Sequence, residues 1–114
     1  MNISELENIS GLTRDTIRYY EKISLISSPQ RDVNGYKIYT KANLQEIRFI
    51  SSAKELGFTL SEIKRGMDSF IKRGRPCENF KNNLEKKKAI IKDRISEDKA
   101  KLKKIEKFLK LAGL

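Results

Sequence analysis

The chain has 114 residues, of which 25 are Lys or Arg and 15 are Asp or Glu, and its formal net charge is +10. That charge on so short a chain favours a polyanionic partner such as DNA, RNA or an acidic membrane surface. Residues 1–76 carry a net charge of +4 and residues 77–114 a net charge of +6. Charge alone therefore does not locate a nucleic-acid-binding face, and residue identity and spacing must do so.

Several classes of function are excluded or disfavoured by the composition. One cysteine cannot form an intrachain disulfide, and the absence of histidine excludes any site that needs an imidazole. No apolar run approaches the roughly 20 residues that span a bilayer, and the polar N-terminus does not resemble a signal peptide. We see no paired carboxylates on an identifiable cleft and no glycine-rich phosphate loop. We therefore expect a cytosolic protein without a membrane partner, an enzymatic activity or a resident cofactor.

The first twenty residues predict two short helices around a tight turn. Ser4 and Glu7 have the spacing of a capping box, and Gly11 supplies the left-handed residue that ends a helix. Thr13 can cap the second helix, which continues through Tyr20. Two helices around a three-residue turn that contains glycine are the sequence form of a helix-turn-helix.

Residues 28–39 predict a small β-hairpin, which we call the wing. The dipeptide Asn34-Gly35 is typical of a tight turn, and aromatic and β-branched residues follow it. Two further helices are expected, one capped by Thr40 and ended by Gly57, the other capped by Thr59 with Glu62. The apolar row of this last helix runs to Phe70 and Ile71, and the stretch 73–76 marks a boundary.

A long uninterrupted helix is predicted from about residue 77 to residue 110. Apolar residues recur along it in two rows seven residues apart, a heptad seam that Lys88 and Asp98 interrupt. The seam residues are Leu84, Ile91, Ile95, Leu102, Ile105 and Leu109. Such a stripe needs a partner, and we predict a second copy of the chain. Periodicity alone does not decide between a parallel and an antiparallel pair.

The segment from Thr13 to Tyr20 has the residues expected of a helix in the major groove. Arg14 and Arg18 lie four apart on one face, and an arginine can contact guanine with two hydrogen bonds or grip a phosphate. Thr13 and Thr16 lie at the helix N-terminus, where hydroxyl and backbone N–H groups meet phosphate oxygens. The alternative is that the arginines are solvated surface charges. Tyr20 is predicted to pack in the core.

The wing alternates aromatic and basic side chains around its turn. Arg31, Tyr36, Lys37 and Tyr39 are candidates for phosphate contacts, since a phenol can donate to phosphate and a lysine neutralises its charge. The alternative is an ordinary hairpin with half-buried aromatic residues, which applies most directly to Tyr39.

Residues 1–71 resemble the DNA-binding domain of MerR-type transcription regulators. The likeness rests on ISELENISGLTRDTIRYYEKISLI, NGYKIYT and ISSAKELGFTLSEIKRGM, in unbroken order. It implies an all-α fold with a small β-hairpin: a winged helix-turn-helix domain over 1–75 and a dimerisation helix over 76–114 that pairs as an antiparallel coiled coil. Arg14, Thr16, Arg18 and Tyr19 would contact DNA from the recognition helix, and Tyr36, Lys37 and Tyr39 from the wing.

The resemblance also implies a mechanism. A homodimer would bind a pseudo-palindromic operator between promoter elements whose spacer is too long, and would distort the DNA so that RNA polymerase can engage. The loop ISSPQRDVNGY departs from the family, in which Leu-Pro and more arginines are common. Family members also carry an effector-sensing region after the long helix, and we expect most of that region to be missing because only residues 112–114 follow.

Cys77 is the one candidate sensor. Its place matches a metal-binding cysteine of metal-responsive family members, but the cysteine pair that those members add beyond the coil is absent. A thiolate at a helix N-terminus can instead respond to oxidants or electrophiles, and a cysteine without a role is the third reading. Two alternative functions stay open: an architectural DNA-binding protein, and a basic coiled-coil interaction module.

Overall fold

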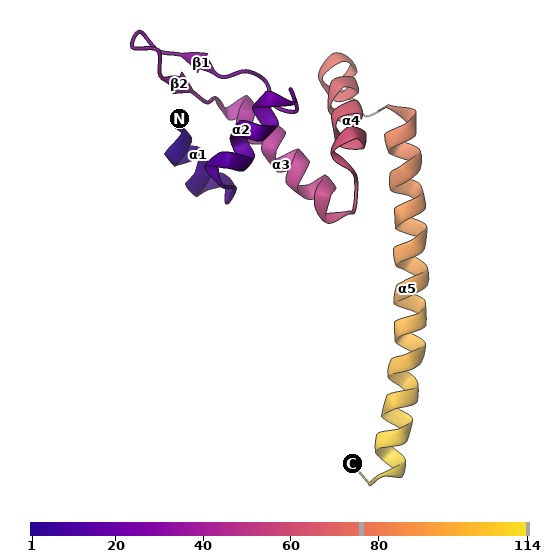
Figure 1. Cartoon of the computed structure of the whole chain (residues 1–114). Coiled ribbons are helices and arrows are strands. Elements are labelled where there is room, and N and C mark those ends of the chain that lie inside the picture. The colour runs from indigo at the N-terminus through magenta and orange to yellow at the C-terminus, as the bar shows by residue number, and fades with distance from the viewer. Residues whose placement is uncertain (76, 114) are drawn as a thin grey trace. The chain divides into compact units, whose positions relative to one another are not determined.

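A computed structural model describes residues 1–75 and 77–113, with every side chain in these ranges except those of Phe70 and Ile71. The described residues form five helices and one two-stranded antiparallel sheet (Figure 1). The chain divides into two units, Met1–Pro76 and Cys77–Leu114. The predicted fold class, a helical domain with a β-hairpin followed by a long helix, is confirmed. Phe70 and Ile71 were predicted to continue the apolar row of the helix capped by Thr59, and their side chains lie outside the described part of the structure.

The first two helices are α1 (Ile3–Ser10) and α2 (Arg14–Lys22). The predicted cap at Ser4 is wrong: Asn2 caps α1, and its Oδ1 accepts a hydrogen bond from the Glu5 backbone N–H at 2.8 Å. Asn is a strong N-cap, and the cap at Asn2, two residues before Ser4, leaves Ser4 and Glu7 free for other partners. Gly11 ends α1 at a φ of +73°. Thr13 caps α2 as predicted, since its hydroxyl oxygen accepts from the Thr16 N–H.

The wing consists of β1 (Gln30–Arg31) and β2 (Lys37–Ile38), which are antiparallel, with Arg31 opposite Lys37. The predicted tight turn is present but lies one residue earlier than Asn34-Gly35: the Gly35 N–H donates to the Asp32 carbonyl at 3.0 Å, so Val33 and Asn34 are its central residues, and Gly35 follows with a positive φ of +83°. The Asp32 carboxylate accepts from the N–H groups of Asn34 at 2.8 Å and Tyr36 at 3.0 Å. These local acceptors stabilise the loop that contains the turn.

Helices α3 (Lys41–Glu55) and α4 (Leu60–Arg73) complete the first unit. Both predicted caps are confirmed: Thr40 forms a capping box with Asn43, and Thr59 exchanges hydrogen bonds with Glu62. Helix α3 packs against α1 and α4, and α1 packs against α2. The core of this unit is formed by Leu6, Ile17, Tyr20, Leu25, Ile26, Tyr39, Ile47, Ile50, Ala53, Phe58, Ile63 and Met67.

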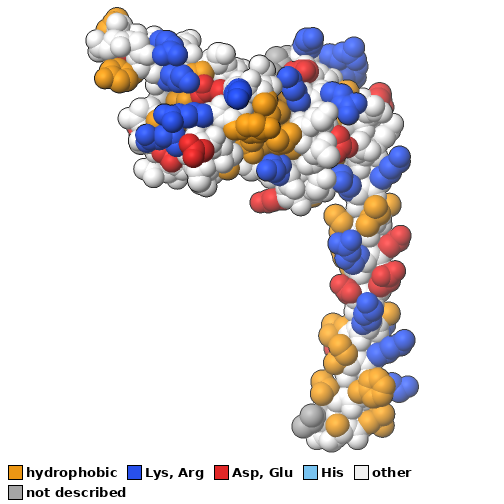
Figure 2. All heavy atoms as spheres, in the orientation of Figure 1, with side chains coloured by type: hydrophobic (Ala, Val, Ile, Leu, Met, Phe, Trp, Pro, Cys, Tyr) orange, Lys and Arg blue, Asp and Glu red, His pale blue; other side chains and the backbone are white. Residues whose placement is uncertain are grey.

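The second unit is dominated by α5 (Glu78–Leu111), a helix of 34 residues. The predicted long helix is therefore confirmed. Of the predicted seam, Leu84 is partly buried, and the other five residues have 42% to 55% of their surface exposed in the single chain. Apolar side chains are visible at intervals along α5 (Figure 2).

Candidate nucleic-acid interface

Helix α2 presents a polar face away from the core. Ile17 and Tyr20 are buried, whereas Arg18 is exposed and Tyr19 keeps 49% of its surface exposed. In the described part of the chain, Arg18 forms no hydrogen bond or ion pair. Lys64 of α4 donates to the Ile23 carbonyl at 3.1 Å and so places a cation at the C-terminal end of α2, where the helix dipole is negative. The buried side chains and the C-terminal end of α2 thus hold the helix in place, and its polar side stays available for contact with a ligand.

Arg14, by contrast, is held by α1. Its Nε donates to Glu7 Oε1 at 3.2 Å, and its Nη2 donates to Ser4 Oγ at 2.8 Å. The backbone N–H of Arg14 also donates to Glu7 Oε2 at 3.0 Å. The guanidinium is nevertheless half exposed, with 43% of the side chain accessible. Sequence reasoning assigned Ser4 and Glu7 to a cap and missed that they orient this arginine.

Thr13 and Thr16 lie together at the N-terminus of α2. Their hydroxyl oxygens are 2.8 Å apart, and Thr13 Oγ1 also accepts from the Thr16 N–H at 3.2 Å. Thr13 is exposed and Thr16 is half-buried. The dipole at the N-terminus of a helix attracts anions. Because Glu7 and Thr13 already accept from the Arg14 and Thr16 N–H groups, the threonine hydroxyls are the donors that this position offers to a phosphate oxygen.

The wing carries exposed aromatic and basic side chains. Tyr36 has 72% of its surface exposed, and Val33 at the tip is fully exposed. Arg31 donates from Nη1 to the Gly35 carbonyl at 2.7 Å, which braces the loop. Figure 2 shows basic side chains on the wing and the adjoining helices of the first unit, with apolar side chains at the wing's tip.

Glu21, the last acidic residue of α2, joins the wing to this helix. Its carboxylate accepts from Lys37 Nζ at 2.8 Å and from the Tyr39 hydroxyl, and only 12% of its side chain is exposed. Tyr39 is buried, and its backbone N–H and carbonyl both pair with Met1. Burial first, and then the hydrogen bond and charge of Glu21, raise the pKa of the Tyr39 hydroxyl well above its ordinary value.

This cluster changes what two of the predicted contacts can do. Tyr39 has its hydroxyl on Glu21 rather than on the surface, so it positions the wing instead of offering a donor to phosphate. Lys37 is partly engaged by the same carboxylate. Sequence reasoning missed Glu21, although an acidic residue in the last turn of a helix opposes the helix dipole and so indicates a partner elsewhere.

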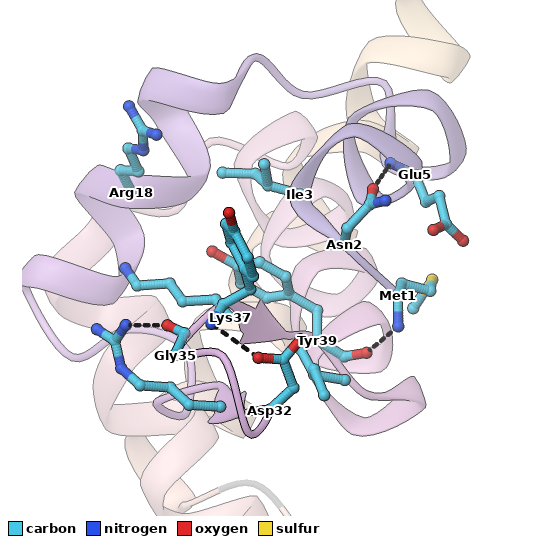
Figure 3. Close-up of a pocket in the computed structure, with 12 residues that line it drawn as sticks. Met1, Asn2, Ile3, Glu5, Arg18, Asp32, Gly35, Lys37 and Tyr39 are labelled. Carbon is cyan, nitrogen blue, oxygen red and sulfur yellow. Dashed lines mark hydrogen bonds between the residues drawn. The ribbon is translucent and has the colours of Figure 1, made fainter.

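A groove of about 690 Å³ lies between the start of α1, the outer face of α2 and the wing. Arg18 lines it from α2, Lys37 and Tyr36 line it from the wing, and Asn2 and Glu5 line it from α1 (Figure 3). The cations and phenols of this groove outnumber its two carboxylates, those of Glu5 and Asp32, and Glu21 joins two of the elements that line it, α2 and the wing. Such an arrangement suits a phosphodiester backbone, because cations neutralise the phosphates and phenols donate to them.

The described residues contain neither a cluster of side chains that could hold a metal ion nor a helix that could cross a membrane. Cys77 is half-buried at the start of α5 and caps the helix without a side-chain hydrogen bond. Within 1–75 and 77–113, no group of three or more His, Cys, Asp or Glu side chains is placed to hold a metal. In the same ranges, no helix combines the length and the apolar character that crossing a membrane requires.

Comparison with known proteins decides the family. Residues 1–69 match the family described as MerR HTH family regulatory protein, and residues 44–110 match the one described as MerR, DNA binding. The chain belongs to the MerR family. It is therefore a DNA-binding transcription regulator, as the sequence motifs predicted.

Individual MerR-family proteins show how far the similarity extends. The chain is 36% identical over 97 residues to the regulator CueR of Escherichia coli O6:H1, covering 85% of this chain and 72% of that one. It is 31% identical over 104 residues to ZntR of Escherichia coli K12, covering 91% and 70%. The crystal structure of HiNmlR, a MerR family regulator lacking the sensor domain and bound to promoter DNA, matches with a TM-score of 0.69 and 25% identity, covering 90% and 77%.

Proposed function

We propose that this MerR-family chain acts as a homodimer that recognises a pseudo-palindromic promoter operator and modulates transcription by distorting the DNA. Each protomer would present one α2 helix and one wing to one half-site, and RNA polymerase would respond to the distorted promoter rather than to a direct contact. The proposed role is binding rather than catalysis. The proposed function places the protein in the bacterial cytosol, where the chromosome lies.

The observation that carries the proposal is the free cation of Arg18 on the wall of the groove. Arg18 and Tyr19 are exposed on α2, and Tyr36 is exposed on the wing. The other proposed contacts are already oriented by hydrogen bonds within the chain: Thr13, Arg14 and Thr16 at the start of α2, and Arg31 and Lys37 on the wing. We therefore rank Arg18, Tyr19 and Tyr36 first among the proposed DNA contacts and assign Tyr39 to positioning.

The family membership favours this reading over an architectural DNA binder or a basic interaction module. The HiNmlR structure supports the proposal further, because that regulator is bound to promoter DNA. We propose no effector for Cys77.

A gel-shift titration with a substituted chain tests the proposal. Arg18→Ala should weaken binding to a selected operator by about 5- to 150-fold for each half-site, the range for losing one base-contacting arginine, and both half-sites of the dimer lose one. Lys107→Ala is the matched control, because it removes the same charge from an exposed position on α5. Equal effects of the two substitutions would contradict the assigned face and favour non-specific attraction to the basic helix. Of the two variants, only Arg18→Ala should also lower the ratio of operator affinity to random-duplex affinity.

A further inference from the structure

Arg14, the first residue of α2, is clamped by two residues of α1. Both oxygens of the Glu7 carboxylate accept from Arg14: Oε2 from its backbone N–H at 3.0 Å, and Oε1 from its Nε at 3.2 Å. Ser4 Oγ accepts from Arg14 Nη2 at 2.8 Å. Nη2 also lies 3.2 Å from Glu7 Oε1 and forms an ion pair with it. The edge of the guanidinium that carries Nε and Nη2 is therefore occupied within the chain.

The remaining nitrogen of the guanidinium keeps its donors. Within residues 1–75 and 77–113, Arg14 Nη1 forms no hydrogen bond, and 43% of the side chain is exposed. Because the guanidinium is planar and rigid, fixing one edge also fixes the direction of the two Nη1 N–H groups. Guanine presents two acceptors, O6 and N7, in the major groove, and a cationic nitrogen can donate to both. The clamped Arg14 is thus suited to a directional contact with a base.

The Glu7 carboxylate also changes the electrostatics of this position. The ion pair has no net charge, and 30% of the Glu7 side chain is exposed beside Arg14. Attraction to phosphate depends on positive charge, because each phosphate that a cation neutralises releases counterions. An arginine paired with a carboxylate therefore adds little to the binding of any duplex. It can still donate hydrogen bonds to a base edge, and such bonds carry the sequence information.

We propose that Glu7 and Ser4 determine sequence specificity by holding Arg14 in position to recognise one guanine in each half-site. The same contacts keep Arg14 from acting as a phosphate contact. This inference rests on the proposed function, in which α2 enters the major groove. It adds the base that Arg14 recognises and the two residues that direct it. Glu7 and Ser4 act through Arg14 and are therefore positioning residues.

The clamp differs from an ordinary surface ion pair. An exposed pair that joins two side chains by one contact is weak and loses side-chain entropy. Here the carboxylate also accepts from the backbone of Arg14, and Ser4 adds a contact from the preceding turn of α1. The arginine is thus ordered before DNA arrives, which lowers the entropy lost on binding. A wrong base then leaves the fixed N–H groups without acceptors, and this mismatch favours guanine.

Titrations with a selected operator and with random duplex, at several salt concentrations, test the proposal. Replacing both partners, Glu7→Gln with Arg14→Ala, should lower operator affinity by about 5- to 150-fold for each half-site. It should leave the affinity for random duplex and its salt dependence as in wild type, because the pair has no net charge. Glu7→Gln alone leaves the charge of Arg14 unbalanced. That variant should bind random duplex more tightly and steepen the slope of log affinity against log salt by about 0.9 per protomer.

Glu5→Gln is the matched control. Glu5 lies on α1 and lines the groove, and its carboxylate forms no hydrogen bond or ion pair in the described part of the chain. The substitution removes the same charge as Glu7→Gln without releasing an arginine. Operator and random-duplex affinities should therefore rise by the same factor, whereas Glu7→Gln should lower their ratio. An unchanged ratio in Glu7→Gln would show that Glu7 only repels DNA, and would overturn the proposal.

Selection of bound sequences locates the base. Sites selected with the double variant should lose the preference for one guanine in each half-site and keep the others, and Glu7→Gln should relax the same position. A double variant that keeps every preference, or that flattens the salt slope by about 0.9 per protomer, would overturn the inference and make Arg14 a phosphate contact. A wild type that binds random duplex as tightly as any selected site would overturn the proposed function as well.

Discussion

Replacing Glu21 should loosen the wing and destabilise the first unit. The carboxylate accepts from Lys37 and from the hydroxyl of Tyr39, which is buried. Glu21→Ala leaves that hydroxyl without an acceptor, and a buried donor without an acceptor lowers the free energy of unfolding by about 1–3 kcal/mol. It also removes an ion pair whose lysine is 37% exposed, for which we allow about 0.5 kcal/mol after solvent screening. We therefore expect a loss of about 1.5–3.5 kcal/mol, a large part of the stability of a small domain.

Urea unfolding followed by tyrosine fluorescence measures this loss, since the chain has no tryptophan and Tyr39 is buried. Glu21→Gln is the matched variant: its amide oxygen can still accept from Tyr39, so it should cost only about 1 kcal/mol. In a Tyr39→Phe background the cost of Glu21→Ala should shrink by at least about 1 kcal/mol, because the orphaned hydroxyl is gone. Equal costs for Glu21→Ala in the two backgrounds would refute the reasoning.

Three further predictions follow from local contacts. Glu7→Ala should lower the free energy of unfolding by about 1 kcal/mol in a urea titration, because Arg14 loses its acceptor. An unchanged free energy of unfolding would show that the Arg14–Glu7 pair is only a surface contact. Asn2→Ala should cost about 1 kcal/mol through loss of the cap, whereas a larger cost for Ser4→Ala would restore Ser4 as the cap. The stability that the neutral Tyr39 hydroxyl provides should be constant below its ordinary pKa of 10.0 and fall as pH rises above it, because the unfolded chain then loses that proton first. The difference in unfolding free energy between wild type and Tyr39→Phe, measured from pH 8 upward, should show this fall; a difference independent of pH would contradict it.

Features set by neighbouring residues were predictable from the sequence. The caps at Thr13, Thr40 and Thr59 each depend on a side chain and a backbone group three residues away. The long helix followed from an uninterrupted pattern between Cys77 and Lys110. The choice of Ser4 over Asn2 failed because two good capping residues stood within one turn, and pattern alone does not rank them.

Features set by distant residues were not predictable in the same way. Glu21 meets Lys37 and Tyr39, 16 and 18 residues away, only after the wing has folded against α2. The alternation of aromatic and basic residues on the wing left open whether Tyr39 is exposed for a phosphate contact or half-buried, and in the structure Tyr39 is buried in the core. The wing's turn lies on Val33-Asn34 rather than on Asn34-Gly35, and the Asp32 carboxylate stabilises this arrangement by accepting from the N–H groups of Asn34 and Tyr36.

Selection of bound fragments from the source genome, followed by footprinting, tests the central claim most directly. We predict enrichment of inverted repeats in promoters with long spacers, protected at two half-sites one or two helical turns apart, with enrichment lost in Arg18→Ala and kept in Lys107→Ala. Fragments without a common repeat, bound equally by both variants, would contradict sequence-specific recognition by α2.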